Sequence, residues 1–160
     1  MRFHLFKITN AVVLFILFTS CKKDNETTQP SGGNGLTPYT VNYPHYFPTL
    51  NIPSDNPLTL EGVQLGRNLY YDTILSNDGR SCSSCHNQSA SFTTYTSNAL
   101  AHVNLGWGTN FLWNGKVSGS VEDIMYFEVH DFFQTNISKL NNSEFYRKQF
   151  KKVYNTETIS

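Results

Sequence analysis

Residues 78–93 read DGRSCSSCHNQSASFT, and within this stretch Cys82, Cys85 and His86 form a Cys-x-x-Cys-His motif. This spacing is the attachment signal of c-type haem. Two thiols separated by two residues can add across the two vinyl groups of one porphyrin, and the next residue is then held where its imidazole meets the iron from one face. The motif therefore predicts a covalent haem c with His86 as the proximal iron ligand.

Three other uses of two nearby cysteines fit the sequence less well. A redox-active pair usually opens a helix that follows a strand, and no strand signal precedes Cys82. A structural zinc site needs four ligands, and the chain has no second cysteine pair. A disulfide across two residues would be strained and would close only a short loop. The haem interpretation is therefore favoured.

The composition limits the size and the partners of the protein. The chain has 160 residues, enough for one domain of ordinary size, and its 12 basic residues balance 12 acidic ones. A formal net charge of zero gives no indication of a nucleic-acid partner. The 12 phenylalanines and 9 tyrosines suit either an aromatic core or the walls of a large flat cofactor.

The N-terminus has the order of parts that a secretory signal shows. Arg2 and Lys7 precede an apolar run over 11–18, and two small residues stand directly before Cys21. The sequence LFTSC resembles a bacterial lipobox, so residues 1–20 are predicted to be a lipoprotein signal peptide and Cys21 the acylated residue. A short transmembrane anchor is the alternative, but the apolar run falls short of the ~20 residues that a span needs.

Residues 21–42 are polar and rich in glycine, proline, serine and threonine. Such a segment buries too little apolar surface to fold, so a flexible tether is predicted here. The folded part is then residues 43–160, held by the lipid in the cell envelope on the periplasmic or cell-surface side. In such a compartment cysteine pairs form disulfides or hold cofactors.

The folded part is predicted to be mainly helical, with long loops and essentially no strand. Three helices are expected: one capped by Thr59 and ending near Tyr71, one capped by Ser120 and running through His130, and a last one capped by Asn142 or Ser143. An apolar stripe runs along the last helix, formed by Tyr146, Phe150, Val153 and Tyr154.

The ligand on the other face of the iron separates an electron carrier from a catalyst. A six-coordinate carrier commonly uses methionine or a second histidine, whereas a peroxidase keeps this position open or able to open. After Cys21 the chain offers Met125 and three further histidines, His45, His102 and His130. Each is more often a core or surface residue than a ligand, so these residues alone leave both functions open.

Beyond the motif, residues 56–93 read NPLTLEGVQLGRNLYYDTILSNDGRSCSSCHNQSASFT. This segment closely resembles the opening of the bacterial di-haem cytochrome c peroxidase family, which includes the methylamine-utilisation maturation enzymes. Residues 111–116, FLWNGK, are similar to the family's FFWDGR, and residues 143–150, SEFYRKQF, are similar to its later YxxxF helix. The resemblance covers approximately residues 43–155.

The resemblance implies two cytochrome-c-like helical domains, each with one covalent haem. Hydrogen peroxide would bind at the N-terminal haem, and the C-terminal haem would accept electrons from a donor cytochrome c or a cupredoxin. This chain has one Cys-x-x-Cys-His motif and resembles the N-terminal, peroxidatic half. The second haem domain is expected either downstream of a truncated sequence, which is favoured, or on a separate partner.

Trp113 takes the place of the tryptophan that lies between the two haems in this family. The resemblance implies that its indole relays electrons, with a core tryptophan in a glycine-rich turn as the alternative. The family's proton-transferring glutamate falls on Phe133, whose side chain cannot move a proton. Glu128, His130 and Asp131 lie nearby in the sequence, and one of them is expected to substitute.

Two alignments give the loop after the motif different roles. One places His102 at the family's reversible distal iron ligand. The other, which is favoured, places His102 at an aliphatic position and leaves the iron five-coordinate. It also places Asn98 at an interdomain calcium ligand.

Together these features predict a haem c peroxidase domain that reduces hydrogen peroxide with electrons from a small redox protein, as part of a two-haem enzyme. A monohaem electron-transfer cytochrome without catalysis is the alternative, and an oxidase that acts on a protein substrate is a third interpretation. The predicted cofactors are covalent haem c and calcium.

Overall fold

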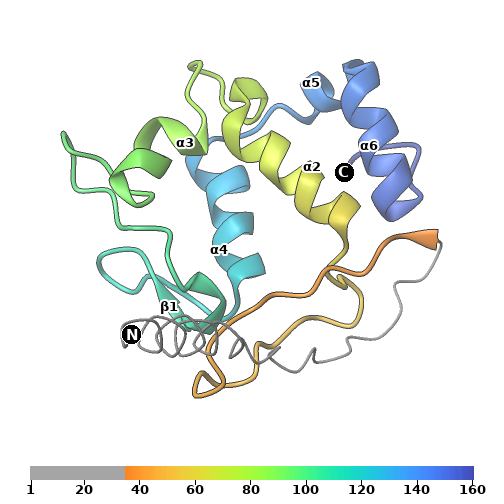
Figure 1. The fold of residues 1–160 in the computed structure, drawn as a ribbon. Coiled ribbons are helices and arrows are strands. Elements are labelled where there is room, and N and C mark those ends of the chain that lie inside the picture. Colours follow the sequence, from red (N-terminus) through yellow and green to blue (C-terminus); the bar gives the residue numbers. More distant parts are fainter. Residues whose placement is uncertain (1–34) are drawn as a thin grey trace, which may run out of the picture.

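The computed structural model describes residues 35–160, whose arrangement Figure 1 shows. The predicted signal peptide (1–20), the predicted lipid-bearing Cys21 and the first part of the predicted tether lie outside the described residues. Within residues 35–160, no helix is both long and apolar enough to cross a membrane.

The described part is mainly helical with long irregular segments, as the sequence predicts. Its elements, in chain order, are α2 (Leu60–Tyr71), the 3-10 turn η2 (Thr73–Leu75), α3 (Cys82–Cys85), the 3-10 turns η3 (Gln88–Ala90) and η4 (Leu105–Trp107), the strands β1 (Asn110–Phe111) and β2 (Val117–Ser118), α4 (Val121–Phe127), the π-helical turn η5 (Glu128–Phe132), α5 (Ile137–Asn142) and α6 (Glu144–Tyr154).

Helix α2 begins and ends where the sequence predicts. The Thr59 hydroxyl accepts a hydrogen bond from the Gly62 backbone N–H at 3.0 Å, and the side chain of Thr59 is almost wholly buried. This bond satisfies one of the backbone donors that the first turn of a helix leaves unpaired. Asp72 follows the last residue of the helix and has an extended backbone. Its carboxylate accepts from the Ile74 N–H and so starts the next turn.

The core lies between α2, α5 and α6, and α6 packs against both of the other helices (Figure 1). Its buried members come from sequence-distant segments: Leu65, Leu75, Phe133, Leu140, Tyr146 and Ile159. The Tyr146 hydroxyl donates to an Asp72 carboxylate oxygen at 2.8 Å, which ties α6 to the end of α2. The predicted stripe of α6 is buried at Tyr146 and exposed at its far end, Tyr154.

Three local features differ from the expectations. The helix capped by Ser120 is α-helical to Phe127 and then widens into the π-helical turn η5. Helix α5, capped by the Asn136 side chain, was not predicted. The pair β1–β2, with Phe111 opposite Val117, adds a small antiparallel hairpin. The last helix, in contrast, begins as predicted, with Ser143 as the one of the two expected caps that the structure uses.

The segment before α2 is fastened to the domain by Trp107. The indole lies edge-to-face against Tyr43 and Phe47, with ring centroids 5.2 and 4.9 Å apart. Its Nε1–H donates to the Pro48 carbonyl at 2.8 Å. Further upstream, the Leu60 N–H donates to the Thr37 carbonyl at 2.8 Å, so ordered contacts begin within the segment that was predicted as tether.

Leu65 gives a direct test of this core. We expect Leu65→Ala to lower the free energy of unfolding by about 2–5 kcal/mol, because the side chain is only 2% exposed and its loss leaves a cavity. The matched change Leu60→Ala, in the same helix but 49% exposed, should cost no more than about 0.5 kcal/mol. Urea unfolding of both variants measures the difference. Equal losses would show that α2 does not bury Leu65.

Candidate haem site

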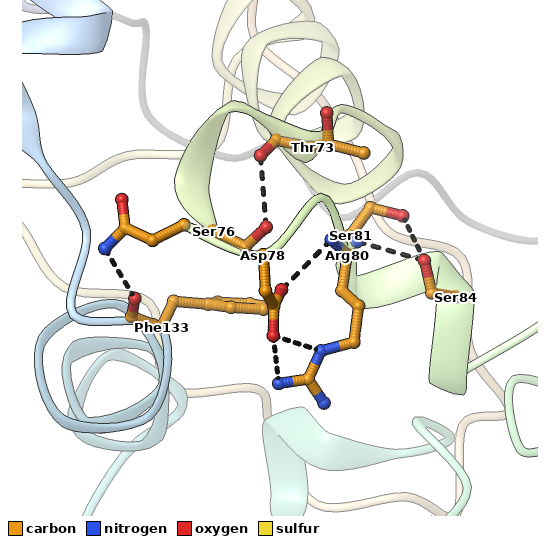
Figure 2. Close-up of polar contacts among 8 residues, drawn as sticks. Thr73, Ser76, Asp78, Arg80, Ser81, Ser84 and Phe133 are labelled. Atoms are coloured by element: carbon orange, nitrogen blue, oxygen red, sulfur yellow. Dashed lines mark hydrogen bonds and ion pairs between the residues drawn. The ribbon is translucent and has the colours of Figure 1, made fainter.

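The two cysteines occupy a single helical turn, α3, that a serine network starts. The Ser81 backbone N–H donates to the Ser84 hydroxyl at 3.0 Å, and the two hydroxyls of Ser81 and Ser84 lie 3.1 Å apart (Figure 2). At the other end of the turn the His86 backbone N–H donates to the Cys82 carbonyl at 2.9 Å. The motif is therefore held in one rigid turn.

The loop before the motif is held by an ion pair within it and by a hydrogen bond to the segment after η5. Asp78 binds the Arg80 guanidinium through its Oδ2 atom, at 2.7 Å from Nε, and Figure 2 shows this pair beneath the buried Ser76. The hydrogen bond from Arg80 lowers the pKa of Asp78 to about 2, so this carboxylate is charged at neutral pH. The Asn77 side-chain amide donates to the Gln134 carbonyl at 2.8 Å, which joins the loop to the end of η5.

Cys82 and Cys85 are both half-buried free thiols, with no disulfide between them. Burial raises the pKa of Cys82 to about 11, and the negative charge of Glu128 adds to this effect. The charge of Glu128 therefore acts on the Cys82 thiol. Within residues 35–160, no group of three or more histidine, cysteine or acidic side chains could hold a metal ion.

The imidazole of His86 is oriented by the backbone that follows it. Its Nδ1 lies 3.2 Å from the Phe92 carbonyl oxygen. A carbonyl can only accept, so Nδ1 carries the proton and the lone pair of Nε2 is free to bind iron. Ser91 and Phe92 both have left-handed backbone, with φ of 56° and 58°, and this tight turn aims the carbonyl at the ring. The residues of the motif thus fit a covalent haem with a histidine ligand.

His102 lies directly against His86. The two rings are stacked with centroids 3.4 Å apart and planes 15° apart. Burial, and then the neighbouring His86, lowers the pKa of His102 to about 4, so the ring is neutral at neutral pH. In this arrangement His102 packs on the side chain that would bind the haem iron.

The turn between β1 and β2 places Trp113 against the backbone of Asn98. Trp113 lies in the turn between β1 and β2 and is 73% exposed, and its Nε1–H donates to the Asn98 backbone carbonyl at 2.6 Å. The alternative of a core tryptophan is therefore wrong for Trp113. In this chain it is Trp107 that packs against other aromatic rings.

The three proton-transfer candidates have different surroundings in η5. Glu128 is half-buried, and burial raises its pKa above the usual value of 4.5. His130 and Asp131 are more than half exposed, and Nδ1 of His130 lies 2.9 Å from an Asp131 carboxylate oxygen. Of the three, Glu128 is the one whose charge contributes to the raised pKa of Cys82.

Phe133 is buried, whereas Met125 is exposed. Phe133 stands where the resemblance puts a catalytic glutamate, and it is buried in the core at 8% exposure. A charged side chain there would be costly to bury. Met125, expected as a core residue, is 36% exposed. His45 is exposed as well and lies edge-to-face against Tyr46.

Two parts of the site were not predicted from the sequence. The Tyr70 hydroxyl donates to the His86 carbonyl at 3.0 Å and lies 3.4 Å from Nδ1 of His102. The Phe92 carbonyl accepts from both His86 and the His102 backbone. Tyr70 is one of many tyrosines in the sequence, and a backbone carbonyl leaves no sequence signal at all.

These features define a class: a small helical domain whose Cys-x-x-Cys-His turn is built to hold a covalent c-type haem. Residues 60–160 match the family model described as di-haem cytochrome c peroxidase, and the chain belongs to that family. Membership implies a covalently bound haem c.

Curated relatives of this chain carry two kinds of names. The methylamine utilization protein MauG of Methylorubrum extorquens is 38% identical over 40% of this chain and 22% of its own length. MauG of Methylophilus methylotrophus is 27% identical over 70% of this chain and 39% of its own length. The cytochrome-c peroxidase IdrP1 of Denitromonas iodatirespirans is 31% identical over 45% of this chain and 23% of its own length. The matched part thus spans at most 39% of these relatives. No solved structure matches the chain.

Proposed function

We propose that this chain is the peroxide-facing haem domain of a two-haem cytochrome c peroxidase, with haem c bound through Cys82 and Cys85 and with His86 as its proximal ligand. The observation that carries the proposal is the orientation of His86, whose Nδ1 is engaged by the Phe92 carbonyl while Nε2 stays free. When bound, haem c supplies an iron that binds peroxide and exchanges electrons.

We assign the movement of the proton to Glu128. Cleavage of the O–O bond of hydrogen peroxide needs a group that takes a proton from one oxygen and gives it to the other. Such a group works best when its pKa is near the working pH, and burial moves the pKa of Glu128 in that direction. Asp131 is the competing candidate, but it is exposed and paired with His130.

The face of the iron opposite His86 is proposed to be open. The stacking of His102 on His86 supports this proposal, because that contact would keep the His102 ring on the side of the proximal residue. A residue that filled this position would instead make the domain a six-coordinate electron carrier, which is the alternative function.

Trp113 is proposed to relay electrons from the second haem. Its exposure supports this role, because an indole at the surface can contact a second domain or a partner chain. Asn98, exposed beside it, is proposed to contribute one ligand to a calcium ion at the same face. Both roles require a second haem domain or a partner chain that faces this surface.

The proposed partners are hydrogen peroxide and a donor cytochrome c or cupredoxin. Two relatives named cytochrome-c peroxidase support this substrate class, and those named MauG leave room for an oxidase that acts on a protein substrate. We further propose that Cys21 carries a lipid that holds the protein in the cell envelope, on the periplasmic or cell-surface side.

Mixing the ferric protein with hydrogen peroxide in a stopped-flow spectrometer tests the proposed function. We expect the Soret band to change at a rate proportional to peroxide concentration, because the open face admits peroxide. Saturation with cyanide beforehand should abolish the change. A low-spin spectrum in both oxidation states, unaffected by peroxide, would contradict the peroxidase function. It would support the alternative function, a six-coordinate electron carrier.

A further inference from the structure

Tyr70, near the end of α2, joins the two stacked histidines. Its hydroxyl donates to the His86 carbonyl at 3.0 Å and lies 3.4 Å from Nδ1 of His102. The side chain is half-buried, and burial raises the pKa of Tyr70 to about 12, so the hydroxyl keeps its proton at neutral pH.

The direction of these hydrogen bonds follows from the number of protons. A tyrosine hydroxyl has one proton to donate, and in Tyr70 this proton goes to the His86 carbonyl. The same oxygen can still accept, so Nδ1 of His102 can donate to it. The chain of donors then runs from His102 through Tyr70 to His86.

A second connection closes this chain into a ring. The Phe92 carbonyl oxygen accepts from Nδ1 of His86 at 3.2 Å and from the backbone N–H of His102 at 3.1 Å. His102 is thereby held at its backbone by Phe92 and at its side chain by Tyr70. Its ring is kept flat against the ring of His86, 3.4 Å away.

This ring of contacts restricts the one rotation that the His86 side chain would retain on binding iron. The hydrogen bond at Nδ1 orients the imidazole, and the stacked ring of His102 restricts rotation of its plane further. The plane determines how the imidazole overlaps with the iron orbitals, and the protein tunes a haem through such contacts beyond its direct ligands.

We propose that Tyr70 is a positioning residue that sets the plane of the proximal His86 through His102. The inference rests on the proposed function, because it requires haem bound to His86. It deepens that function by assigning control of the haem's electronic properties to a hydroxyl group at the end of α2.

The test compares Tyr70→Phe with Tyr71→Phe in the haem-loaded full chain. Phenylalanine at 70 keeps the ring, which lies edge-to-face against Phe92 and Tyr71 at 6.3 and 5.2 Å, and removes only the hydroxyl. Tyr71 is a matched control, because its hydroxyl donates its hydrogen bond to the exposed Gln88 side chain, at 2.9 Å, and not to a histidine.

Two readouts report on the plane of His86 rather than on folding. We expect Tyr70→Phe to shift and broaden the ferric EPR signal and to shift the reduction potential, while Tyr71→Phe matches the unsubstituted protein in both. His102→Phe, which keeps a flat ring but has no Nδ1 donor, should change the EPR signal in the same direction. The thermal unfolding midpoints of the variants check that the fold is retained.

Identical EPR signals and potentials for Tyr70→Phe, Tyr71→Phe and the unsubstituted protein would overturn the inference. If Tyr70→Phe does not fold, the EPR signal and reduction potential of His102→Phe test the inference instead, and values equal to those of the unsubstituted protein would overturn it. Failure of the proposed function looks different: the unsubstituted protein would lack covalent haem, or would carry it without responding to peroxide. In the latter case the comparison of the tyrosine variants still stands.

Discussion

Replacing Cys82 and Cys85 together by serine is expected to abolish covalent attachment of haem. Serine hydroxyls do not add to the porphyrin vinyl groups, so His86 alone would hold any haem and would lose it on denaturation. A haem-stained denaturing gel and the intact mass of the purified protein measure the result. Each single substitution leaves one thiol, so those variants should form one thioether bond and retain part of the covalent haem.

The third cysteine of the chain gives the matched control. Cys21→Ser also removes a thiol, but it lies outside the motif, so the protein should keep its full haem content. Covalent haem in the double variant Cys82→Ser/Cys85→Ser would contradict the assignment of the motif. Loss of haem in Cys21→Ser would show that export of the chain, rather than attachment itself, had been measured.

Glu128→Gln is expected to slow the reaction with hydrogen peroxide by roughly 10²- to 10⁴-fold, the range that a positioned acid–base group contributes. Glutamine has nearly the same shape but cannot take up a proton. Stopped-flow measurement of the second-order rate constant checks the effect. Glu122→Gln, an exposed change in the first turn of α4, serves as control and should keep the original rate constant.

The pH dependence gives Glu128 a second signature. A base accepts a proton only when it is deprotonated, so the rate constant should fall as pH drops through the pKa of Glu128. Burial raises that pKa, so the fall should set in above pH 4.5. In Glu128→Gln this acid limb should disappear. A larger loss in Asp131→Asn than in Glu128→Gln would assign the proton transfer to Asp131 instead.

Features that depend on neighbouring residues were predictable from the sequence. The cap of α2 by Thr59 and the cap of α4 by Ser120 are local, since each involves a side chain and a backbone N–H three residues away. The haem motif is local too, because it needs only the spacing of two thiols and the imidazole that follows.

The rest of the site depends on contacts between distant segments. Tyr70 meets residues that lie 16 and 32 positions later in the chain. The left-handed backbone of Ser91 and Phe92 uses residue types that rarely adopt it, so no turn signal marked it. The π-helical turn after Phe127 ends where Phe133 enters the core, an effect of packing rather than of helix propensity.

The contrast between the two tryptophans has a practical consequence in fluorescence. The chain has two tryptophans, of which Trp113 is 73% exposed, while Trp107 donates its N–H to Pro48 and packs against two aromatic rings. A water-soluble quencher should therefore reach Trp113 before it reaches Trp107. Because the proposed relay residue lies at the surface, its emission would report the docking of a second haem domain or an electron donor without any added label.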